Sequence, residues 1–344
     1  MNKRVAIVFM ALTLVFSTLF AVGCSNKIEN INKESKSSMD DANKENKKEK
    51  IKIAALKGPT GMGLVKLMEE NKDDYDITMF NSPTQIVPKI VNGEFDVAAV
   101  PANSAAVLYN KTKGGVKLVG INTLGVLHIV ENGDTIKSIK DLKGKTLYAS
   151  GKGAVPEYVL NYILKKNGLE PDKDVKIEYK MHHSDLATAV ASKKVEIAVL
   201  PEPFVTTVKM KNKDLKIQLD LTKEWEKVSD ANSKLVMGTL ICRKDFIDKR
   251  GKDVDEFLDR YRKSIDFVNS NKTEAGKLIE KNGIILKAAI AEKAIPKCNI
   301  VFISSQDGKD SLEKFYSILN KSNPKSIGGK IPDENFYYTS KKTN

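Results

Sequence analysis

The sequence has few of the residues that carry redox and metal chemistry. Its 344 residues include three cysteines and three histidines. Cys242 and Cys298 could pair in an oxidising compartment, but we expect them to be two buried free thiols. The adjacent His182 and His183 have only His128 as a further histidine, and on a strand neighbouring side chains point to opposite faces. We therefore predict no metal site, and we expect no cofactor.

Long apolar runs are also scarce. One covers residues 5–22 behind two basic residues, and no later run is long enough to span a membrane. A basic segment, an apolar stretch and small residues before a cleavage point are typical of a secretory signal, which we place at residues 1–23. The next residue, Cys24, resembles the lipobox cysteine of bacterial lipoproteins. That resemblance implies a diacylated Cys24 at the mature N-terminus, with a plain signal peptide or a membrane helix as the alternative.

Residues 24–50 are rich in charge and contain only Ile28 and Ile31 as aliphatic anchors. Such a stretch cannot bury enough apolar surface to offset its ordering entropy, so it is predicted to be a flexible tether. The whole chain carries a formal charge of +13. Because the lysines are scattered and the signal indicates export, we interpret this charge as solubility and attraction to an anionic envelope, not as nucleic-acid binding.

From Ile51 onward, predicted strands and helices alternate with short connections. This pattern indicates an α/β protein with mostly parallel sheets covered on both faces. Extended crossovers are expected at residues 122–130 and 235–242, and everything beyond the second crossover, including Cys298, is expected to be helical. The predicted parts are lobe one at 51–122, lobe two at 123–235, and the return strand and C-terminal helices of lobe one at 236–344. Because ligands lie beyond the carboxyl ends of strands, we expect a ligand cleft between the lobes.

The most informative turn is Ser150-Gly151-Lys152-Gly153, between a predicted strand at 146–149 and a helix with Pro156 in its first turn. Glycines allow close backbone approach to a ligand, and free N–H groups at a helix start attract anions. The turn lacks the Gly-Lys-Ser/Thr of a P-loop, and Pro156 replaces the third glycine of a dinucleotide fingerprint. An ordinary strand-to-helix connection remains the alternative.

Four stretches together resemble a known family. They are the strand-loop-helix from Ile51, GEFDVAAVPANSAAVLYN (93–110), DLKGKTLYASGKGAVPEYVL (141–160) and EIAVLPEPFVT (196–206). They are similar to the solute-binding lipoproteins of ABC importers, in the branch that includes aliphatic-sulfonate, taurine, nitrate and thiamin-pyrimidine binders. The resemblance covers residues 51–320 and implies a type II periplasmic-binding-protein-like fold. It also implies a monomer on the extracytoplasmic face, a small-molecule solute, permease and ATPase partners, and no chemistry of its own.

The candidate ligand-binding residues lie in the loops at strand ends. They are Lys57, Gly58, Thr60, Gly61, Ser82 and Asn103 from lobe one, and Ser150, Gly151, Lys152, Gly153, His182, Glu202 and Phe204 from lobe two. The lysines would offset an anion, Glu202 would accept from an amine or ring N–H, and Phe204 would stack on a flat ring. Each residue has a capping or loop-stabilising role as its alternative. The absence of arginine from these loops weakens a carboxylate or sulfonate clamp. The lysines and helix starts favour an anionic group, whereas Glu202 and Phe204 favour a nitrogen heterocycle. We therefore expect a small polar organic solute, with both classes left open.

Two other function classes stay open. Relatives of this fold include enzymes of pyrimidine-related chemistry, which need a nucleophile or an acid–base pair in the cleft. Cys242 is the candidate nucleophile apart from Cys24 and Cys298, but it lies in a predicted strand without a neighbouring histidine in the sequence. We therefore expect binding and not catalysis. An adhesin or scaffold would leave the cleft without a ligand.

Overall fold

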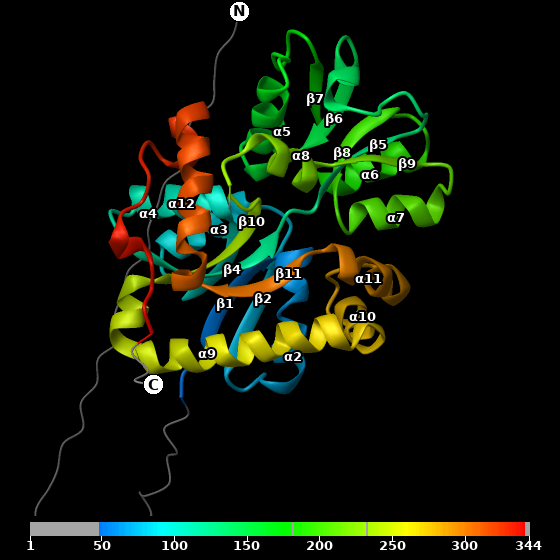
Figure 1. The fold of residues 1–344 in the computed structure, drawn as a ribbon. Coiled ribbons are helices and arrows are strands. Elements are labelled where there is room, and N and C mark those ends of the chain that lie inside the picture. Colours follow the sequence, from blue (N-terminus) through cyan, green and yellow to red (C-terminus); the bar gives the residue numbers. More distant parts are fainter. Residues whose placement is uncertain (1–47, 181, 232, 341–344) are drawn as a thin grey trace, which may run out of the picture. The chain divides into compact units, whose positions relative to one another are not determined.

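The computed structural model describes residues 48–180, 182–231 and 233–340. The predicted signal peptide, Cys24 and the tether up to residue 47 lie outside the described residues. The described residues belong to one compact unit that contains two β-sheets with helices packed against them (Figure 1). Within this part of the chain, no helix combines the length and apolar character needed to cross a membrane.

The first sheet and its helices are called lobe one. Its strand order is β11-β4-β10-β3-β1-β2, with β1 parallel to β2 and β3, β10 antiparallel to β3 and β4, and β11 antiparallel to β4. The strands are β1 (Ile51–Leu56), β2 (Tyr75–Phe80), β3 (Val97–Pro101), β4 (Val116–Leu124), β10 (Val236–Arg243) and β11 (Ile300–Ser304). The helices are α1 (Pro59–Met62), α2 (Val65–Glu70), α3 (Pro83–Val91), α4 (Ala102–Lys111), α9 (Lys244–Ser270), α10 (Lys272–Lys281), α11 (Ala288–Ala294) and α12 (Ser305–Ser322), with the short 3₁₀ turns η2 (Ile295–Lys297), η3 (Pro324–Ile327) and η4 (Glu334–Phe336).

The second sheet and its helices are called lobe two. Its order is β7-β6-β8-β5-β9, with β6 parallel to β7 and β8 and β5 antiparallel to β8 and β9. The strands are β5 (Leu127–Glu131), β6 (Thr146–Ser150), β7 (Lys176–Lys180), β8 (Ile197–Pro201) and β9 (Lys216–Asp220). The helices are η1 (Ile139–Leu142), α5 (Val155–Lys166), α6 (His183–Ala191), α7 (Phe204–Lys211) and α8 (Leu221–Val228). The chain enters lobe two between β4 and β5 and leaves it between β9 and β10.

The central strands are buried on both faces, and their side chains alternate between two cores. In β1, Ala54 packs into the core that includes α3, α4 and α12, whereas Ile53 and Ala55 pack into the core under α2 and α9. In β8, Val199 and Leu200 divide in the same way between two cores. This period of two, without a solvent face, is what a helix-covered sheet requires. Polar chemistry is thereby restricted to the strand ends.

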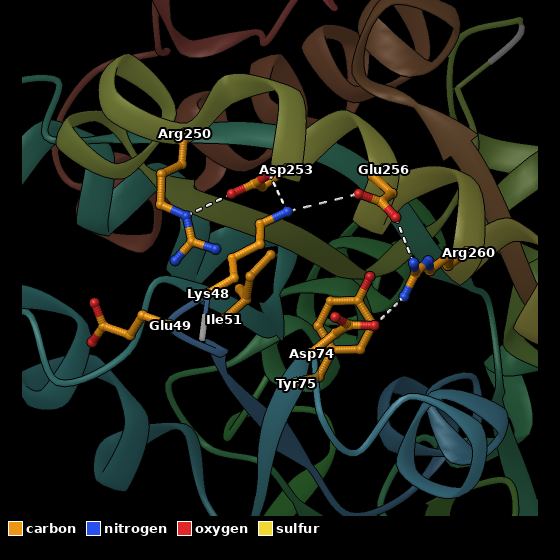
Figure 2. A pocket seen from close by; sticks show the side chains of 9 residues that line it. All are labelled: Lys48, Glu49, Ile51, Asp74, Tyr75, Arg250, Asp253, Glu256 and Arg260. Carbon is orange, nitrogen blue, oxygen red and sulfur yellow. Dashed lines mark hydrogen bonds and ion pairs between the residues drawn. The ribbon is translucent and has the colours of Figure 1, made fainter. Parts of the chain in front are cut away.

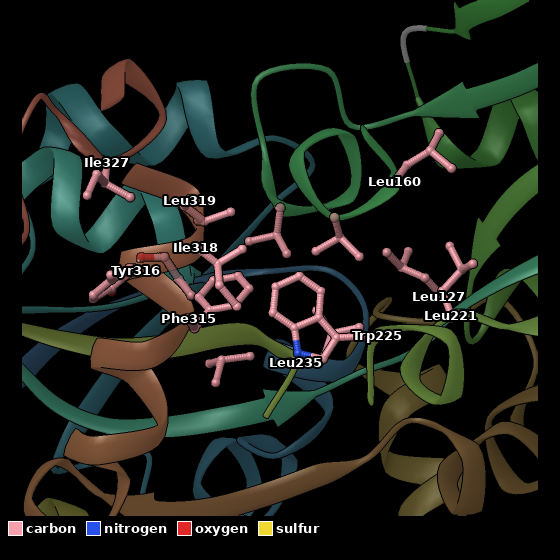
Figure 3. Packing of buried hydrophobic residues seen from close by; sticks show 14 of the residues in the cluster. Leu127, Leu160, Leu221, Trp225, Leu235, Phe315, Tyr316, Ile318, Leu319 and Ile327 are labelled. Atoms are coloured by element: carbon pink, nitrogen blue, oxygen red, sulfur yellow. Dashed lines mark hydrogen bonds between the residues drawn. The ribbon is translucent and has the colours of Figure 1, made fainter. Parts of the chain in front are cut away.

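One hydrophobic core continues from lobe one into lobe two. Trp225 of α8 is fully buried, and Figure 3 shows it facing Phe315 of α12. The two ring centroids are 5.5 Å apart, and the ring centroid of Tyr162 in α5 lies 5.1 Å from that of Trp225. Its indole N–H donates to the carbonyl of Ser233 at 2.9 Å. A single side chain therefore joins helices of both lobes, with its polar atom satisfied.

The predicted fold class is confirmed: this is a two-lobed α/β protein of the type II periplasmic-binding-protein kind, crossed twice by the chain. Three strands run antiparallel to their neighbours: β5 and β10, which begin after the two crossovers, and the edge strand β11. The sheets are therefore mixed and not uniformly parallel. The predicted lobe boundaries at residues 122 and 235 stay predictions.

Several local predictions were wrong. Residues beyond 243 are not all helical, because Ile300–Ser304 forms the edge strand β11 and Cys298 lies just outside η2; the β-branched and aromatic run there favours a strand. The loop at 57–63 contains the short helix α1. Helix α4 begins at Ala102, so Asn103 lies in its first turn. The pair at 182–183 starts helix α6 and is not on a strand.

Replacing Trp225 with alanine tests the shared core. We expect the free energy of unfolding to fall by about 3–5 kcal/mol, because a large buried aromatic side chain leaves a cavity. Urea denaturation followed by circular dichroism measures this. Leu286→Ala is the control, since Leu286 is 89% exposed and its loss should change stability by less than about 0.5 kcal/mol. An equally small effect of Trp225→Ala would contradict the packing described.

Candidate functional site

The candidate residues lie where strands of both sheets end. In lobe one, Lys57 follows β1, Ser82 lies two residues after β2, and Asn103 lies two residues after β3. In lobe two, Ser150 is the last residue of β6 and Glu202 directly follows β8. The strands concerned are parallel within each sheet, so these positions share one edge of each sheet.

The first loop of lobe one is held mainly by its own backbone. Gly58 has φ of 116°, a conformation that glycine adopts without strain. The hydroxyl of Thr60 donates to the carbonyl of Leu56 at 3.1 Å. A Cβ atom on Gly61 would lie 2.6 Å from that same carbonyl oxygen, so packing alone requires glycine there. Lys57 is exposed, and its side chain extends into solvent.

Two lobe-one helices begin without a neutralising side chain. The N-cap of α1 is Gly58 and that of α4 is Pro101; neither helix has a capping side chain or an acidic residue in its first turn. By contrast, Ser82 caps α3 as predicted, accepting from the N–H of Thr84 at 3.3 Å. The uncapped start of α4 leaves free N–H groups at the positive end of a helix dipole, which favours oxygen atoms of a ligand. In α1, by contrast, Pro59 has no N–H, and the N–H groups of Gly61 and Met62 donate to the carbonyl of Gly58.

Asn103 connects the two lobes. Its side-chain amide donates to the carbonyl of Gly153 in lobe two at 3.3 Å and to the carbonyl of Ser326 in η3 at 3.2 Å. The residue is 2% exposed, and its Oδ1 has no hydrogen-bond partner. Of the predicted residues, Asn103 and Gly153 are thus brought into contact across the lobes.

In the glycine-rich turn of lobe two, a nearby carboxylate already binds one of the backbone N–H groups. Gly151 and Gly153 have φ of 81° and 76°, as a turn that needs glycine requires. However, the N–H of Gly153 donates to the carboxylate of Glu157 at 2.5 Å. The ammonium of Lys152 lies over the ring of Tyr179, 5.5 Å from its centroid. An anion at this turn would compete with Glu157, so the turn is a weaker anion site than its sequence indicates.

The structure assigns a polar role to His183, which sequence reasoning passed over for its neighbour. The Oγ of Ser150 lies 2.5 Å from Nδ1 of His183, and the imidazole packs against the ring of Phe204 with 5.6 Å between centroids. His182 is the exposed N-cap residue of α6. His183 is the first residue of α6, and His182 precedes it as the N-cap.

Burial, together with the nearby His182, lowers the pKa of His183 to about 4. The imidazole is therefore neutral at physiological pH and acts through hydrogen bonds, not charge. Since Ser150 is 2% exposed, the pair is fixed in place before any ligand arrives. Three of the predicted residues lie beside His183: Ser150, Gly151 and Phe204.

Glu202 is 1% exposed and caps helix α7. Its Oε2 accepts from the N–H of Thr206 at 3.0 Å, and its Oε1 has no partner. An unpartnered, buried carboxylate oxygen is costly, so this atom is available to a donor such as an amine or ring N–H. The predicted role of Glu202 stays a prediction, with one of its two oxygens already used structurally.

The thiols differ from reactive cysteines. Cys242 and Cys298 are both buried and unpaired, as expected, and burial raises the pKa of each well above its usual range. A protonated thiol is a poor nucleophile. Among residues 48–180, 182–231 and 233–340, no three His, Cys, Asp or Glu side chains are arranged to hold a metal ion.

A pocket lies at the opposite ends of the strands, beside Lys48, the first described residue (Figure 2). Its charged groups pair with one another: Lys48 and Arg250 with Asp253, each at 2.6 Å, and Arg260 with Asp74 and Glu256, each at 2.5 Å. Because these ions satisfy one another, the pocket offers little to a polar ligand. The carboxyl-end residues are the stronger candidate site.

Comparisons with known proteins bear on the family and the fold. Residues 64–232, about half of the chain, match the family described as "ABC transporter, phosphonate, periplasmic substrate-binding protein". A protein of Brucella abortus described as a binding protein is 31% identical over 144 residues, which are 42% of this chain and 43% of that protein. The alignment thus spans less than half of that relative's length.

Solved structures share the fold at low sequence identity. An ABC transporter protein from Parabacteroides distasonis has a TM-score of 0.72 at 24% identity, covering 85% of this chain and 99% of that one. The periplasmic aliphatic sulphonate binding protein SsuA from Escherichia coli has a TM-score of 0.65 at 16% identity, covering 86% and 93%. Each of these structures aligns with most of the length described here.

The pH dependence of stability tests the environment of His183. Its folded pKa of about 4 lies below the value of about 6.5 for an unfolded histidine. Between these values the unfolded chain binds more protons, so acidification destabilises the fold. From pH 7 to pH 5, wild type should lose roughly 2 kcal/mol more than His183→Gln. His182→Gln, at the exposed neighbour, is the control. Parallel pH curves for wild type and His183→Gln would refute the assigned environment.

Proposed function

We propose that this chain, whose residues 64–232 match the substrate-binding proteins of ABC transporters, captures a small polar solute outside the cytoplasm and delivers it to a membrane permease driven by an ATPase. The observation that supports this most is the contact of Asn103 with Gly153, beside the Ser150–His183 pair. Polar groups from both lobes meet at strand ends, so a solute held there would contact both lobes at once. Closure of the lobes around the solute would then signal occupancy to the permease.

The site favours a solute with oxygen acceptors and at least one donor. Free N–H groups at the start of α4 and the exposed Lys57 suit oxygen atoms or an oxyanion. The open Oε1 of Glu202 suits an N–H group, and Phe204 beside His183 offers a flat apolar surface. A sulfonate or phosphonate, as named for the comparison proteins, fits the acceptor part of this description.

Catalysis is the less favoured alternative. A serine hydroxyl beside a histidine is the arrangement of an activated nucleophile, and Ser150 with His183 has this form. However, an imidazole whose pKa is lowered to about 4 is a weak general base at neutral pH, and the buried thiols, whose pKa values are raised, are poor nucleophiles. We therefore propose binding without turnover. Release of product from a bound solute, abolished by Ser150→Ala, would reverse this preference.

Native mass spectrometry of the protein as purified, and after unfolding and refolding, tests the function directly. We expect a small-molecule mass on the purified protein that disappears on refolding. Adding the recovered compound back should raise the melting temperature, because a ligand that binds only the folded state stabilises it. Ser150→Ala should retain less of the compound than wild type. A protein that retains no compound and responds to no sulfonate, phosphonate or pyrimidine would contradict the proposal.

We further propose that the chain is held on the extracytoplasmic face of the membrane by acyl chains on Cys24, as a monomer. Each buried methylene of an acyl chain contributes about 0.8 kcal/mol, so two chains suffice for stable attachment. Wild type expressed in bacteria should partition with membranes and take up labelled palmitate. Cys24→Ser should be unlabelled, whereas Cys242→Ser should behave as wild type. Labelling that survives Cys24→Ser would disprove the anchor.

A further inference from the structure

The C-terminal segment 324–340, which we call the strap, reaches the candidate site. The side-chain amide of Asn110 in α4 donates to the carbonyls of Ile327 and Lys330 at 2.8 and 2.7 Å. Further along, the N–H of Tyr338 donates to the carbonyl of Leu118 at 2.9 Å. A Cβ atom on Gly328 would lie 3.1 Å from Val107 in α4, so the strap lies close against this helix. Its first turn, η3, is thereby held beside Asn103.

Two buried polar atoms at this junction lack partners. Ser326 of η3 is 1% exposed and Asn103 is 2% exposed, and neither Ser326 Oγ nor Asn103 Oδ1 has a hydrogen-bond partner. Their residues are in contact, since the Asn103 amide donates to the Ser326 carbonyl at 3.2 Å. Nearly all buried polar groups in proteins are paired, so two unpaired atoms on adjacent residues point to a missing group.

The orientation of the Asn103 side chain fixes what that group must be. Its Nδ2 faces two carbonyl oxygens, those of Gly153 and Ser326, and both can only accept. Turning the amide over would place Oδ1 against these acceptors, so Oδ1 must point elsewhere as an acceptor. The missing partner is therefore a donor. Ser326 Oγ can accept from the same donor or donate to a neighbouring oxygen of the same molecule.

We propose that Asn103 Oδ1 and Ser326 Oγ form a polar subsite that receives a hydrogen-bond donor of the solute, an amino or hydroxyl group. This inference rests on the proposed function and adds to it a specificity residue from the strap. Asn103 is joined to lobe two by its 3.3 Å hydrogen bond to the carbonyl of Gly153. The donor group of the solute therefore enters as Gly153 moves away from Asn103. A solute of this kind combines oxygen acceptors with a nearby donor.

Matched pairs of compounds test the proposal. The full-length protein, purified in detergent and refolded without solute, is titrated with taurine and ethanesulfonate, and with 2-aminoethylphosphonate and ethylphosphonate. The members of each pair differ in one amino group. We expect at least one amino compound to bind about tenfold more tightly than its partner, which corresponds to one hydrogen bond to a charged donor. In Ser326→Ala this preference should fall to about threefold or less.

Stability separates the subsite from a structural role. Ser326→Ala keeps the backbone carbonyl that Asn103 contacts and removes an unpaired hydroxyl, so the melting temperature of the solute-free protein should stay equal or rise. Ser305→Ala is the matched control. Ser305 is also buried, but its hydroxyl donates to the carbonyl of Tyr338 in the strap. Its loss should lower the melting temperature and leave the preference for amino compounds unchanged.

The other outcomes are equally decisive. Equal binding within each pair, or a preference that survives Ser326→Ala, overturns the subsite and leaves the proposed function intact. If none of the four compounds binds, the solute recovered from the purified protein tests the subsite instead. A solute without N–H or O–H groups overturns the subsite, and one with them supports it only if Ser326→Ala retains less. A protein that neither binds a compound nor retains a solute ends both proposals.

Discussion

Burial of the central strands on both faces is the constraint on which the rest of the structure depends. When Ala54 and its neighbours in β1 alternate between two hydrophobic cores, no sheet face is left for polar groups, and polar chemistry moves to the strand ends. There the chain must stop pairing, turn, and start a helix. The same constraint operates in both sheets, and Trp225 joins helices of the two lobes at a shared core. Polar strand ends of both lobes are thereby brought within hydrogen-bonding distance at Asn103 and Gly153.

The electrostatics of these strand ends differ between the lobes. In lobe two, Glu157 already occupies the N–H of Gly153, and burial keeps His183 neutral. In lobe one, the start of α4 carries no such compensation. Discrimination in lobe two therefore depends on the direction of hydrogen bonds, whereas lobe one attracts oxygen atoms through helix dipoles. A solute with separate acceptor and donor groups satisfies both lobes, and one with a single kind of group leaves buried atoms unpaired.

Local patterns in the sequence were sufficient for the fold and for part of the site. Some features depend only on neighbouring residues, so they could be predicted: the turn at Ser150, the cap at Ser82 and helix α5, which has Pro156 in its first turn. Strand β11 was missed because its pairing with β4 is distant in sequence, and a short β-branched run next to helices carries no local signal of its partner. Ser326 could not be found from the sequence either, since its place beside Asn103 depends on a strap more than two hundred residues away. His183 could have been preferred to His182 by asking which residue starts the helix.

The most direct test of the account is a crystal structure of the protein as purified, without added ligand. The account predicts density for a small molecule at the strand ends, in contact with Asn103 in lobe one and with the Ser150–His183 pair in lobe two. Density confined to the pocket of Lys48, Asp253 and Arg260 would contradict it. A sample that holds a solute by mass spectrometry, but whose lobes are closed with Asn103, Ser150 and His183 touching only protein, would contradict it as well.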